Sequence, residues 1–254
     1  MTHRLQNKIA LITGASRGIG AAVAKRFAQE GAQLILVARS SADLERIDDE
    51  MQKYGPPAVL VPFDLTDLPR IDDFAKSIAE RFGRLDILIG NAAILGGLTP
   101  MTHITPTSWH RIMTTNLHAN WHLLKAFEPL LMTSQNARII FVTSEVAKNP
   151  TPYWGVYGVS KAALEMMAKT YAAEVKNLGF KVNLIDPGSV NTDMCAEWMP
   201  GQDPTTLHLP DDITEAFVCL AEDACPWHGE VLNAQNLVQD RANNPMNKGH
   251  FEIF

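Results

Sequence analysis

The sequence predicts an α/β fold in which a doubly wound parallel sheet forms a single domain. Seven short, almost uninterrupted apolar runs are typical of parallel strands that helices cover on both faces. Segments with helical periodicity alternate with these runs, and that alternation gives a doubly wound sheet. The expected strands are Ile9–Ile12, Leu34–Val37, Val59–Val61, Leu85–Ile89, Ile139–Val142, Val182–Ile185 and Val231–Leu232.

The segments between the strands carry helix signals of their own. Ser40, with Asp43 three residues later, is expected to cap the helix that follows the second strand. Residues 71–82 carry an apolar stripe with a 3.6-residue period, which is typical of a helix that packs on a sheet. Two longer helices are expected near 107–131 and 154–178.

The length and the composition fit one domain of this kind. The chain has 254 residues, of which 46% are apolar, and that is enough for one core. We expect the domain to cover residues 1–240 and a C-terminal tail to cover residues 241–254. The tail is polar except for its apolar end, which holds Phe251, Ile253 and Phe254.

A glycine-rich turn follows the first expected strand. Gly14, Gly18 and Gly20 come soon after the apolar run that ends at Ile12, and a helical segment begins at Ala21. A strand, a glycine turn and a helix in this order form the dinucleotide site of a Rossmann fold. The glycines let the backbone approach a pyrophosphate, whose charge is stabilised at the helix N-terminus.

The end of the second strand indicates which dinucleotide is bound. An Asp or Glu about 20 residues after the glycine turn would bind the ribose hydroxyl of NAD, but this chain has Arg39 there and no acid. Arg17 lies inside the glycine turn itself. Two guanidiniums can hold a 2′-phosphate through paired hydrogen bonds, although each arginine alone is equally consistent with a solvated surface charge. We therefore expect NADP(H) as the cofactor.

Ser144, Tyr157 and Lys161 form the candidate catalytic group. A spacing of four places Tyr157 and Lys161 on one face of a helix, one turn apart. A cation beside a phenol favours the phenolate, so we expect a lowered pKa that makes Tyr157 a proton donor and acceptor near neutral pH. Ser144 can hydrogen-bond a substrate carbonyl or hydroxyl. By itself this tyrosine–lysine spacing is common on helix surfaces, and the glycine turn upstream gives it weight.

Together these motifs give the chain a resemblance to the classical short-chain dehydrogenase/reductase family. The resemblance covers about residues 5–235, in the family's order and spacing. It implies a Rossmann fold and an enzyme that transfers a hydride between NADP(H) and a carbonyl or secondary alcohol. The matching residues are Thr13, Gly14, Gly18, Gly20, Asp64, Leu65, Thr66, Asp67, Asn91, Ala92, Ala93, Asn116, Ser144, Tyr157, Lys161, Pro187, Gly188, Val190 and Thr192.

The resemblance also implies roles for these residues. Tyr157 is implied as the proton donor, Ser144 as its orienting partner and Lys161 as a contact of the nicotinamide ribose. Asn116 is implied to support a proton relay that begins at Lys161, and Asp64 to bond the adenine amino group. The catalytic set is thus Asn116, Ser144, Tyr157 and Lys161. The residues expected at the cofactor are Gly14, Ser16, Arg17, Gly18, Ile19, Gly20, Arg39, Asp64, Leu65, Asn91, Ala92, Tyr157, Lys161, Pro187, Gly188, Val190 and Thr192.

The residues expected around the substrate are mainly apolar or aromatic. That composition favours an apolar or aromatic carbonyl compound over a phosphorylated sugar. Glu145 is an unusual charge there, which either selects a polar or cationic group or points to solvent, and we favour solvent. The expected set is Leu95, Gly96, Glu145, Tyr153, Trp154, Met194, Trp198 and Met199.

Two other functions stay open on the sequence alone. A regulator could bind NADP without turnover, although it would have little need for the complete catalytic set. A 3-oxoacyl reductase that acts on acyl carrier protein would meet an acidic partner, and the net charge of −6 disfavours that encounter.

Charge and composition narrow the compartment and the other ligands. A net charge of −6 argues against general nucleic-acid binding. No secretory signal and no run of 18 apolar residues is found, so neither export nor a membrane span is expected. The three cysteines lack metal-ligand spacing and indicate a reducing, cytoplasmic location. His118 and His122 are four residues apart but have no third ligand, so no metal is expected.

We expect a homo-oligomer, either a tetramer or a dimer. The helices near 107–131 and 154–178 carry more apolar side chains than one sheet face can cover. The family resemblance points to the same two helices, which often form a four-helix interface in that family. The apolar end of the tail is expected to dock on a neighbouring subunit.

Overall fold

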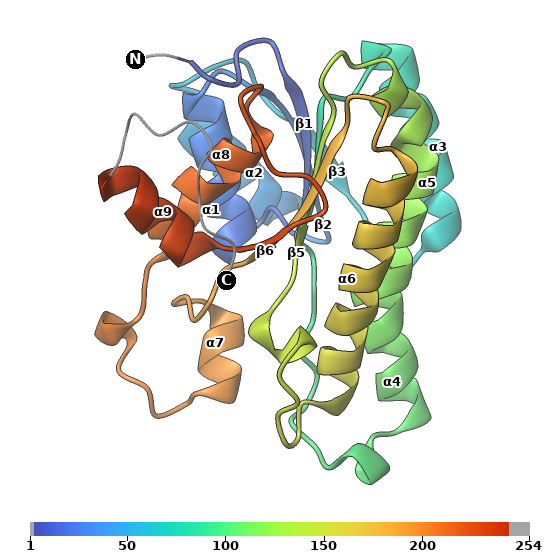
Figure 1. Cartoon of the computed structure of the whole chain (residues 1–254). Coiled ribbons are helices and arrows are strands. Elements are labelled where there is room, and N and C mark those ends of the chain that lie inside the picture. The colour runs from blue at the N-terminus through green and yellow to red at the C-terminus, as the bar shows by residue number, and fades with distance from the viewer. Residues whose placement is uncertain (1–2, 244–254) are drawn as a thin grey trace.

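The computed structural model describes residues 3–243 and contains a seven-stranded sheet with the order β3-β2-β1-β4-β5-β6-β7. All neighbouring strands are parallel, and helices form a layer on each side of the sheet (Figure 1). The strands are β1 (Ile9–Thr13), β2 (Gln33–Ala38), β3 (Val59–Pro62), β4 (Ile87–Gly90), β5 (Arg138–Val142), β6 (Lys181–Asp186) and β7 (Val231–Asn233). The seven expected strands and the doubly wound Rossmann arrangement are confirmed.

Two apolar cores, one on each face of the sheet, hold the helix layers. Because side chains alternate along a strand, Leu34 and Leu36 of β2 enter one core while Ile35 and Val37 enter the other. The first core is covered by α1 (Gly18–Gln29), α2 (Ser41–Met51), α8 (Thr214–Ala221) and α9 (Ala234–Asn243). The second is covered by α3 (Leu68–Phe82), α5 (Ala119–Met132) and α6 (Gly155–Glu174).

Local helix signals in the sequence are reproduced closely. The Ser40 hydroxyl accepts a hydrogen bond from the Asp43 backbone N–H at 3.2 Å, so the expected cap of α2 is confirmed. The longer helices differ from their expected bounds. The first is divided into α4 (Pro106–Met113), a π-helical segment (Thr114–His118) and α5, while α6 ends at Glu174, ahead of the left-handed Gly179.

The apolar excess that we expected on these long helices is smaller than the sequence indicates. Phe127 and Leu164, two of the apolar side chains on these helices, are fully buried in the core of their own chain. The excess that remains exposed consists of a few large side chains, among them Trp109, Trp121 and Met166.

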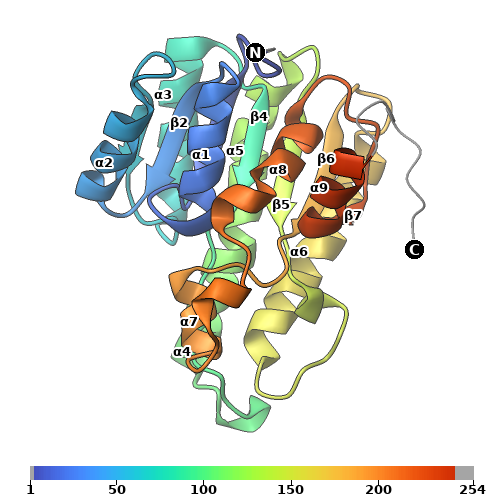
Figure 2. The same ribbon diagram turned by 90° about the vertical axis from the view of Figure 1, so that its left-hand side faces the viewer.

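The carboxyl edge of the sheet faces an open region of the molecule. Strand β1 pairs with β2 on one side and with β4 on the other, so the chain winds outward in both directions from this point. α4 and α7 (Asp193–Trp198) extend past this edge (Figure 2). Doubly wound sheets bind ligands at such a switch point.

α9 is the last element that the structure describes. Arg241 on this helix donates to Glu222 Oε1 at 2.9 Å and to Cys219 Sγ at 2.6 Å, which ties α9 to α8. Phe251, Ile253 and Phe254, and the docking that we expected for them, lie outside the described residues. Within residues 3–243, no helix combines the length and the apolar character that crossing a bilayer needs.

Candidate active site

A cavity of about 1000 Å³ extends along the carboxyl edge of the sheet. It is lined at one end by the glycine turn and at the other by Ser144, Tyr157 and Lys161, from distant parts of the chain. All the residues expected at the cofactor line it except Gly20, and all the expected catalytic residues line it except Asn116. The structure therefore gathers both predicted groups around one space.

The glycine turn requires glycines for steric reasons. Gly14 and Gly18 have φ values of 65° and 54°, in the left-handed region that other residues rarely adopt. Gly20 is needed for close packing instead, since a Cβ there would lie 2.2 Å from the Gly14 carbonyl oxygen. Helix α1 can therefore begin directly against the turn, with its N-terminus toward the cavity.

Thr13 and Asn91 connect the turn to the neighbouring strand β4. The Thr13 hydroxyl accepts hydrogen bonds from the backbone N–H groups of Asn91 and Ala92, both at 3.0 Å. The Asn91 side chain donates to the Thr13 carbonyl oxygen at 2.8 Å. These bonds fix the floor of the cavity where a dinucleotide would cross from one half of the sheet to the other.

Cationic side chains gather at the glycine-turn end. Arg17 and Arg39 line the cavity there, as expected. The sequence did not reveal three further cations at this end, which are Lys25, Arg46 and Arg111. Arg46 donates to the Ser16 carbonyl oxygen at 3.2 Å, so α2 also braces the turn. The helix cap at Ser40 fixed where α2 begins, but nothing in the sequence said which of its faces meets the turn.

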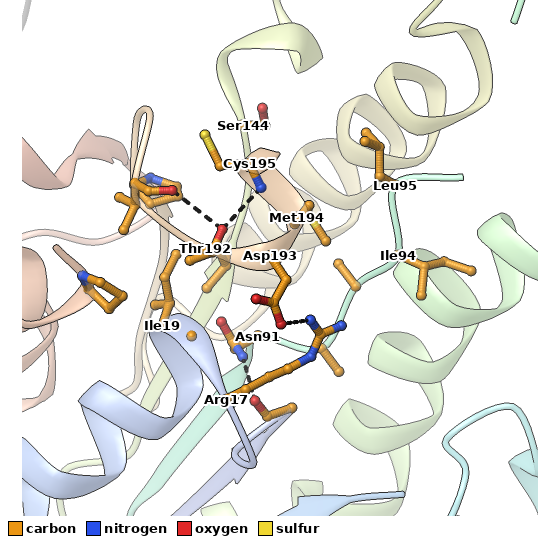
Figure 3. Close-up of a pocket in the computed structure, with 18 of the residues that line it drawn as sticks. Arg17, Ile19, Asn91, Ile94, Leu95, Ser144, Thr192, Asp193, Met194 and Cys195 are labelled. Atoms are coloured by element: carbon orange, nitrogen blue, oxygen red, sulfur yellow. Dashed lines mark hydrogen bonds and ion pairs between the residues drawn. The ribbon is translucent and has the colours of Figure 1, made fainter. Parts of the chain in front are cut away.

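Arg17 forms an ion pair across the mouth of the cavity. Figure 3 shows its guanidinium pointing toward the carboxylate of Asp193, at the start of α7. The preceding residue, Thr192, caps α7 by accepting a hydrogen bond from the Cys195 N–H at 3.2 Å. α7 is thereby held over the turn by one exposed charge pair and one capped end.

Asp64 lies at the same end, just after β3. Its Oδ1 accepts hydrogen bonds from the Thr66 backbone N–H at 2.9 Å and from the Thr66 hydroxyl at 2.8 Å. Partial burial raises the pKa of this carboxyl, but these bonds and the charges of Arg39 and Arg111 lower it overall. Asp64 therefore presents a fixed acceptor to the cavity.

At the catalytic end, the pKa of Tyr157 differs from the one that we expected. Burial, reinforced by the negative charge of Asp186, raises the pKa of this phenol to about 12, although a hydrogen bond with Ser144 acts in the opposite direction. We expected Lys161 to lower that pKa, and this was wrong, because the spacing of four showed a nearby cation but not the burial. The Tyr157 phenol is thus a neutral proton donor at pH 7.

Lys161 is held by the sheet rather than by the phenol oxygen. Its Nζ donates to the Val142 carbonyl oxygen at 2.8 Å and lies 5.6 Å from the centre of the Tyr157 ring. Complete burial lowers the pKa of Lys161 to about 8, partly offset by Asp186. The ammonium is therefore prepositioned at the end of β5, next to the tyrosine that it was expected to tune.

Asn116 lies beside the catalytic helix but outside the cavity. It is fully buried in the π-helical segment, and its side-chain amide pairs with the backbone of Ile94 at 2.9 and 3.0 Å. The same amide donates to the Ser160 hydroxyl at 3.0 Å, while the Asn116 carbonyl accepts from Asn120 at 2.8 Å. Asn116 thus fixes the position of α6 relative to the loop after β4.

A buried pair links the two elements that carry the catalytic group. The Thr143 hydroxyl, next to Ser144, donates to Glu165 Oε1 at 2.9 Å. Both residues are buried, and Glu165 lies one helical turn after Lys161 on α6. This bond holds the end of β5 against α6, and no pattern in the sequence predicts it.

Asp186 is another cavity residue that the sequence analysis missed. It ends β6, and its Oδ1 accepts a hydrogen bond from the Gly188 N–H at 3.0 Å. Burial and the nearby Glu145 and Glu165 raise the pKa of this carboxyl. Its place directly before the Pro187–Gly188 turn is the signal that could have revealed it.

Aromatic side chains surround the space next to Tyr157. The Trp154 ring lies 5.7 Å from the Tyr157 ring and 5.1 Å from the Trp198 ring, both in edge-to-face geometry. Five of the expected substrate residues line the main cavity, namely Leu95, Glu145, Trp154, Met194 and Trp198. Gly96 lines a smaller adjoining cavity instead, while Tyr153 and Met199 line neither.

Metal binding has no visible basis in the part of the chain that the structure describes. No group of three or more His, Cys, Asp or Glu side chains is arranged there to hold an ion.

Comparison with known proteins decides the family. The sequence model for short chain dehydrogenases matches residues 8–203. The chain belongs to the short-chain dehydrogenase family. Members are oxidoreductases that use a nicotinamide cofactor and act on CH–OH groups.

Several short-chain dehydrogenases resemble the chain over most of its length. The oxidoreductase YciK of Escherichia coli (strain K12) is 32% identical over 222 residues, which are 86% of this chain and 88% of that protein. Galactitol 2-dehydrogenase of Agrobacterium fabrum is 36% identical over 189 residues, 74% of this chain and 72% of that protein. A short-chain dehydrogenase of Shigella flexneri 2a, solved in complex with NADP, is 32% identical with a TM-score of 0.89, covering 92% of this chain and 100% of that one.

Proposed function

We propose that the protein is an NADP(H)-dependent oxidoreductase that interconverts a carbonyl compound and the corresponding secondary alcohol. One observation carries the proposal. The cavity joins a cationic, glycine-lined end to an end where Ser144, Tyr157 and Lys161 meet. The first end suits a phosphorylated dinucleotide, and the second suits proton transfer to a carbonyl oxygen.

The residues at the first end fit NADP(H). Because the glycines of the Gly14–Gly20 turn carry no side chains, a pyrophosphate can come close to the backbone at the N-terminus of α1. Arg39 and Arg17 would hold the 2′-phosphate, and Asp64 would accept from the adenine amino group. The NADP complex of the Shigella flexneri relative supports this choice of cofactor.

The second end would supply the acid. The nicotinamide supplies or accepts the hydride when bound. Tyr157, kept neutral by burial, would donate its proton to the substrate oxygen during reduction. Ser144, which hydrogen-bonds Tyr157, would orient that oxygen, and Lys161 would contact the nicotinamide ribose. Pro187, Gly188, Val190 and Thr192 would bound the nicotinamide.

A panel of carbonyl compounds tests the proposal, with oxidation of NADPH as the readout. We expect at least one apolar or aromatic ketone or aldehyde to be reduced, and Tyr157→Phe to abolish that reduction. A protein that binds NADPH and reduces no member of the panel would instead favour the regulator that the sequence left open.

We also propose a homo-oligomer, a tetramer or a dimer, that forms through α4, α5 and α6. Trp121 and Met166 expose 47% and 67% of their surfaces on α5 and α6, and Trp109 exposes 39% on α4. Exposed apolar surface of this kind, when it is contiguous, marks a contact with a partner. The cytoplasmic location expected from the sequence stays a prediction.

A further inference from the structure

Cations outnumber carboxylates at the nucleotide end of the cavity, where Asp64 and Asp193 also lie, whereas carboxylates outnumber cations at the catalytic end. Arginines and a lysine line the nucleotide end, namely Arg17, Lys25, Arg39, Arg46 and Arg111. The catalytic end is lined by the carboxylates of Glu145 and Asp186 and by the ammonium of Lys161. Arg111 also lines the smaller adjoining cavity, next to Leu95, Gly96 and Met194. Lys148 lies within electrostatic range of Asp186 but does not line the cavity.

Lys161 does not offset those carboxylates for a substrate. Its side chain is buried, and its ammonium donates to the Val142 carbonyl oxygen. In the proposed function it would also contact the cofactor ribose, so it is not available to pair with an anionic substrate. Next to Tyr157, carboxylates therefore outnumber the cations that a substrate could reach.

Two aromatic side chains line the same cavity as Glu145. The rings of Trp154 and Trp198 meet edge to face, with their centres 5.1 Å apart. Indole faces attract alkylammonium groups through their negative quadrupole. Glu145 is exposed, and within residues 3–243 its carboxylate accepts one side-chain hydrogen bond, at Oε1 from Asn149 Nδ2 at 3.1 Å.

We propose that the substrate carries a positively charged nitrogen, which Glu145 pairs with while Trp154 and Trp198 cover its alkyl groups. This inference rests on the proposed function, because it concerns the substrate of the same site. Glu145 is then the residue that makes the site prefer a cationic substrate over a neutral one. Carboxylate, phosphate and acyl-carrier substrates are disfavoured by the same carboxylates.

Three acetophenones that differ at the para position test this inference. One carries a trimethylammonium group, one the isosteric neutral tert-butyl group and one a carboxylate. Their binding is measured by calorimetry with and without NADP⁺, and their reduction is followed with NADPH. We expect the cationic ketone to bind about tenfold more tightly than the neutral one, and the carboxylate most weakly.

Glu145→Gln should bring the cationic and neutral ketones to nearly equal affinity while the affinity for NADPH is retained. Glu80→Gln, which removes an equal charge from the exposed surface of α3, should keep the tenfold preference. Equal binding of the two ketones by the unmodified protein, an unchanged preference in Glu145→Gln, or no binding of any ketone overturns the inference.

Failure of the proposed function has a different signature. In that case calorimetry shows the preference for the cationic ketone and its loss in Glu145→Gln, yet no ketone is reduced. Reduction of the neutral and cationic ketones at equal efficiency, by contrast, supports the proposed function and contradicts the charge preference.

Discussion

The two ends of the cavity are built in different ways. At the nucleotide end the backbone forms the surface, and the charged groups are exposed, with 62% of the Arg17 side chain open to solvent. At the catalytic end the working groups are part of the core, and Lys161 is only 2% exposed. Exposed charges contribute little to folding, whereas a buried ammonium affects both chemistry and stability. Substitutions at the two ends should therefore have separable consequences.

Tyr157→Phe should have the largest effect, and it should be confined to chemistry. The variant loses the proton donor but keeps the ring that packs against Trp154, so we expect turnover to fall by about 10²–10⁴-fold. NADPH affinity, measured by calorimetry, should be retained. Turnover within tenfold of the parent would show that the buried end is not the site of proton transfer.

Arg39→Asp should alter the nucleotide end alone. Each charge-assisted contact to a 2′-phosphate is worth roughly 1.5–3 kcal/mol, so we expect the preference for NADPH over NADH to fall by about 10- to 150-fold. Because Arg39 is exposed, the thermal midpoint should hardly move.

Arg81→Asp is the matched control for that change, since it reverses an exposed charge at the far end of α3. It should leave the cofactor preference intact. A large loss of stability in Arg39→Asp, or an equal loss of NADH and NADPH binding, would remove the distinction between the two ends.

Lys161 should make the free energy of unfolding depend on pH, because its pKa is lower in the folded protein than in the unfolded chain. The pKa of Lys161 falls from 10.5 to about 8 on folding. At pH values between these two, the unfolded chain binds a proton that the native protein lacks. Stability should then rise with pH across that window, by up to about 1.4 kcal/mol per pH unit. Urea denaturation between pH 8 and about 9.5 measures the slope, and Lys161→Met should reduce it.

The smallest effect on the cavity should come from substituting the exposed apolar side chains of α5 and α6. Light scattering should give a mass that is a multiple of the 28.0 kDa chain, and Trp121→Glu should lower it while NADPH affinity changes little. A mass near 28 kDa for the unmodified protein at micromolar concentration would contradict the proposed oligomer.

The nucleotide end was largely predictable because its signals are local. The order of strand, glycine turn and helix fixes where a pyrophosphate can approach, and Arg39 is found by its place at the end of β2. Arg46 and Arg111 were missed because they reach the cavity only through the packing of α2 and α4, which no short pattern records.

The catalytic end was predictable in composition but not in electrostatics. Tyr157 and Lys161 are recognised from their spacing, and Ser144 from its hydroxyl thirteen residues before Tyr157 together with the family resemblance. The raised pKa of Tyr157 depends on burial and on Asp186, which comes from a different strand. The pairing of Thr143 with Glu165 is equally non-local. Sequence therefore identified which groups meet, while the fold decides how they ionise.

The most direct test of the account compares NADPH and NADH in calorimetric titrations of the unmodified protein. A cavity with a phosphate-binding end predicts that NADPH binds at least about tenfold more tightly, since one charge-assisted contact accounts for that difference. Equal affinities for the two cofactors would contradict the account, because the cations at the glycine turn would then recognise no 2′-phosphate.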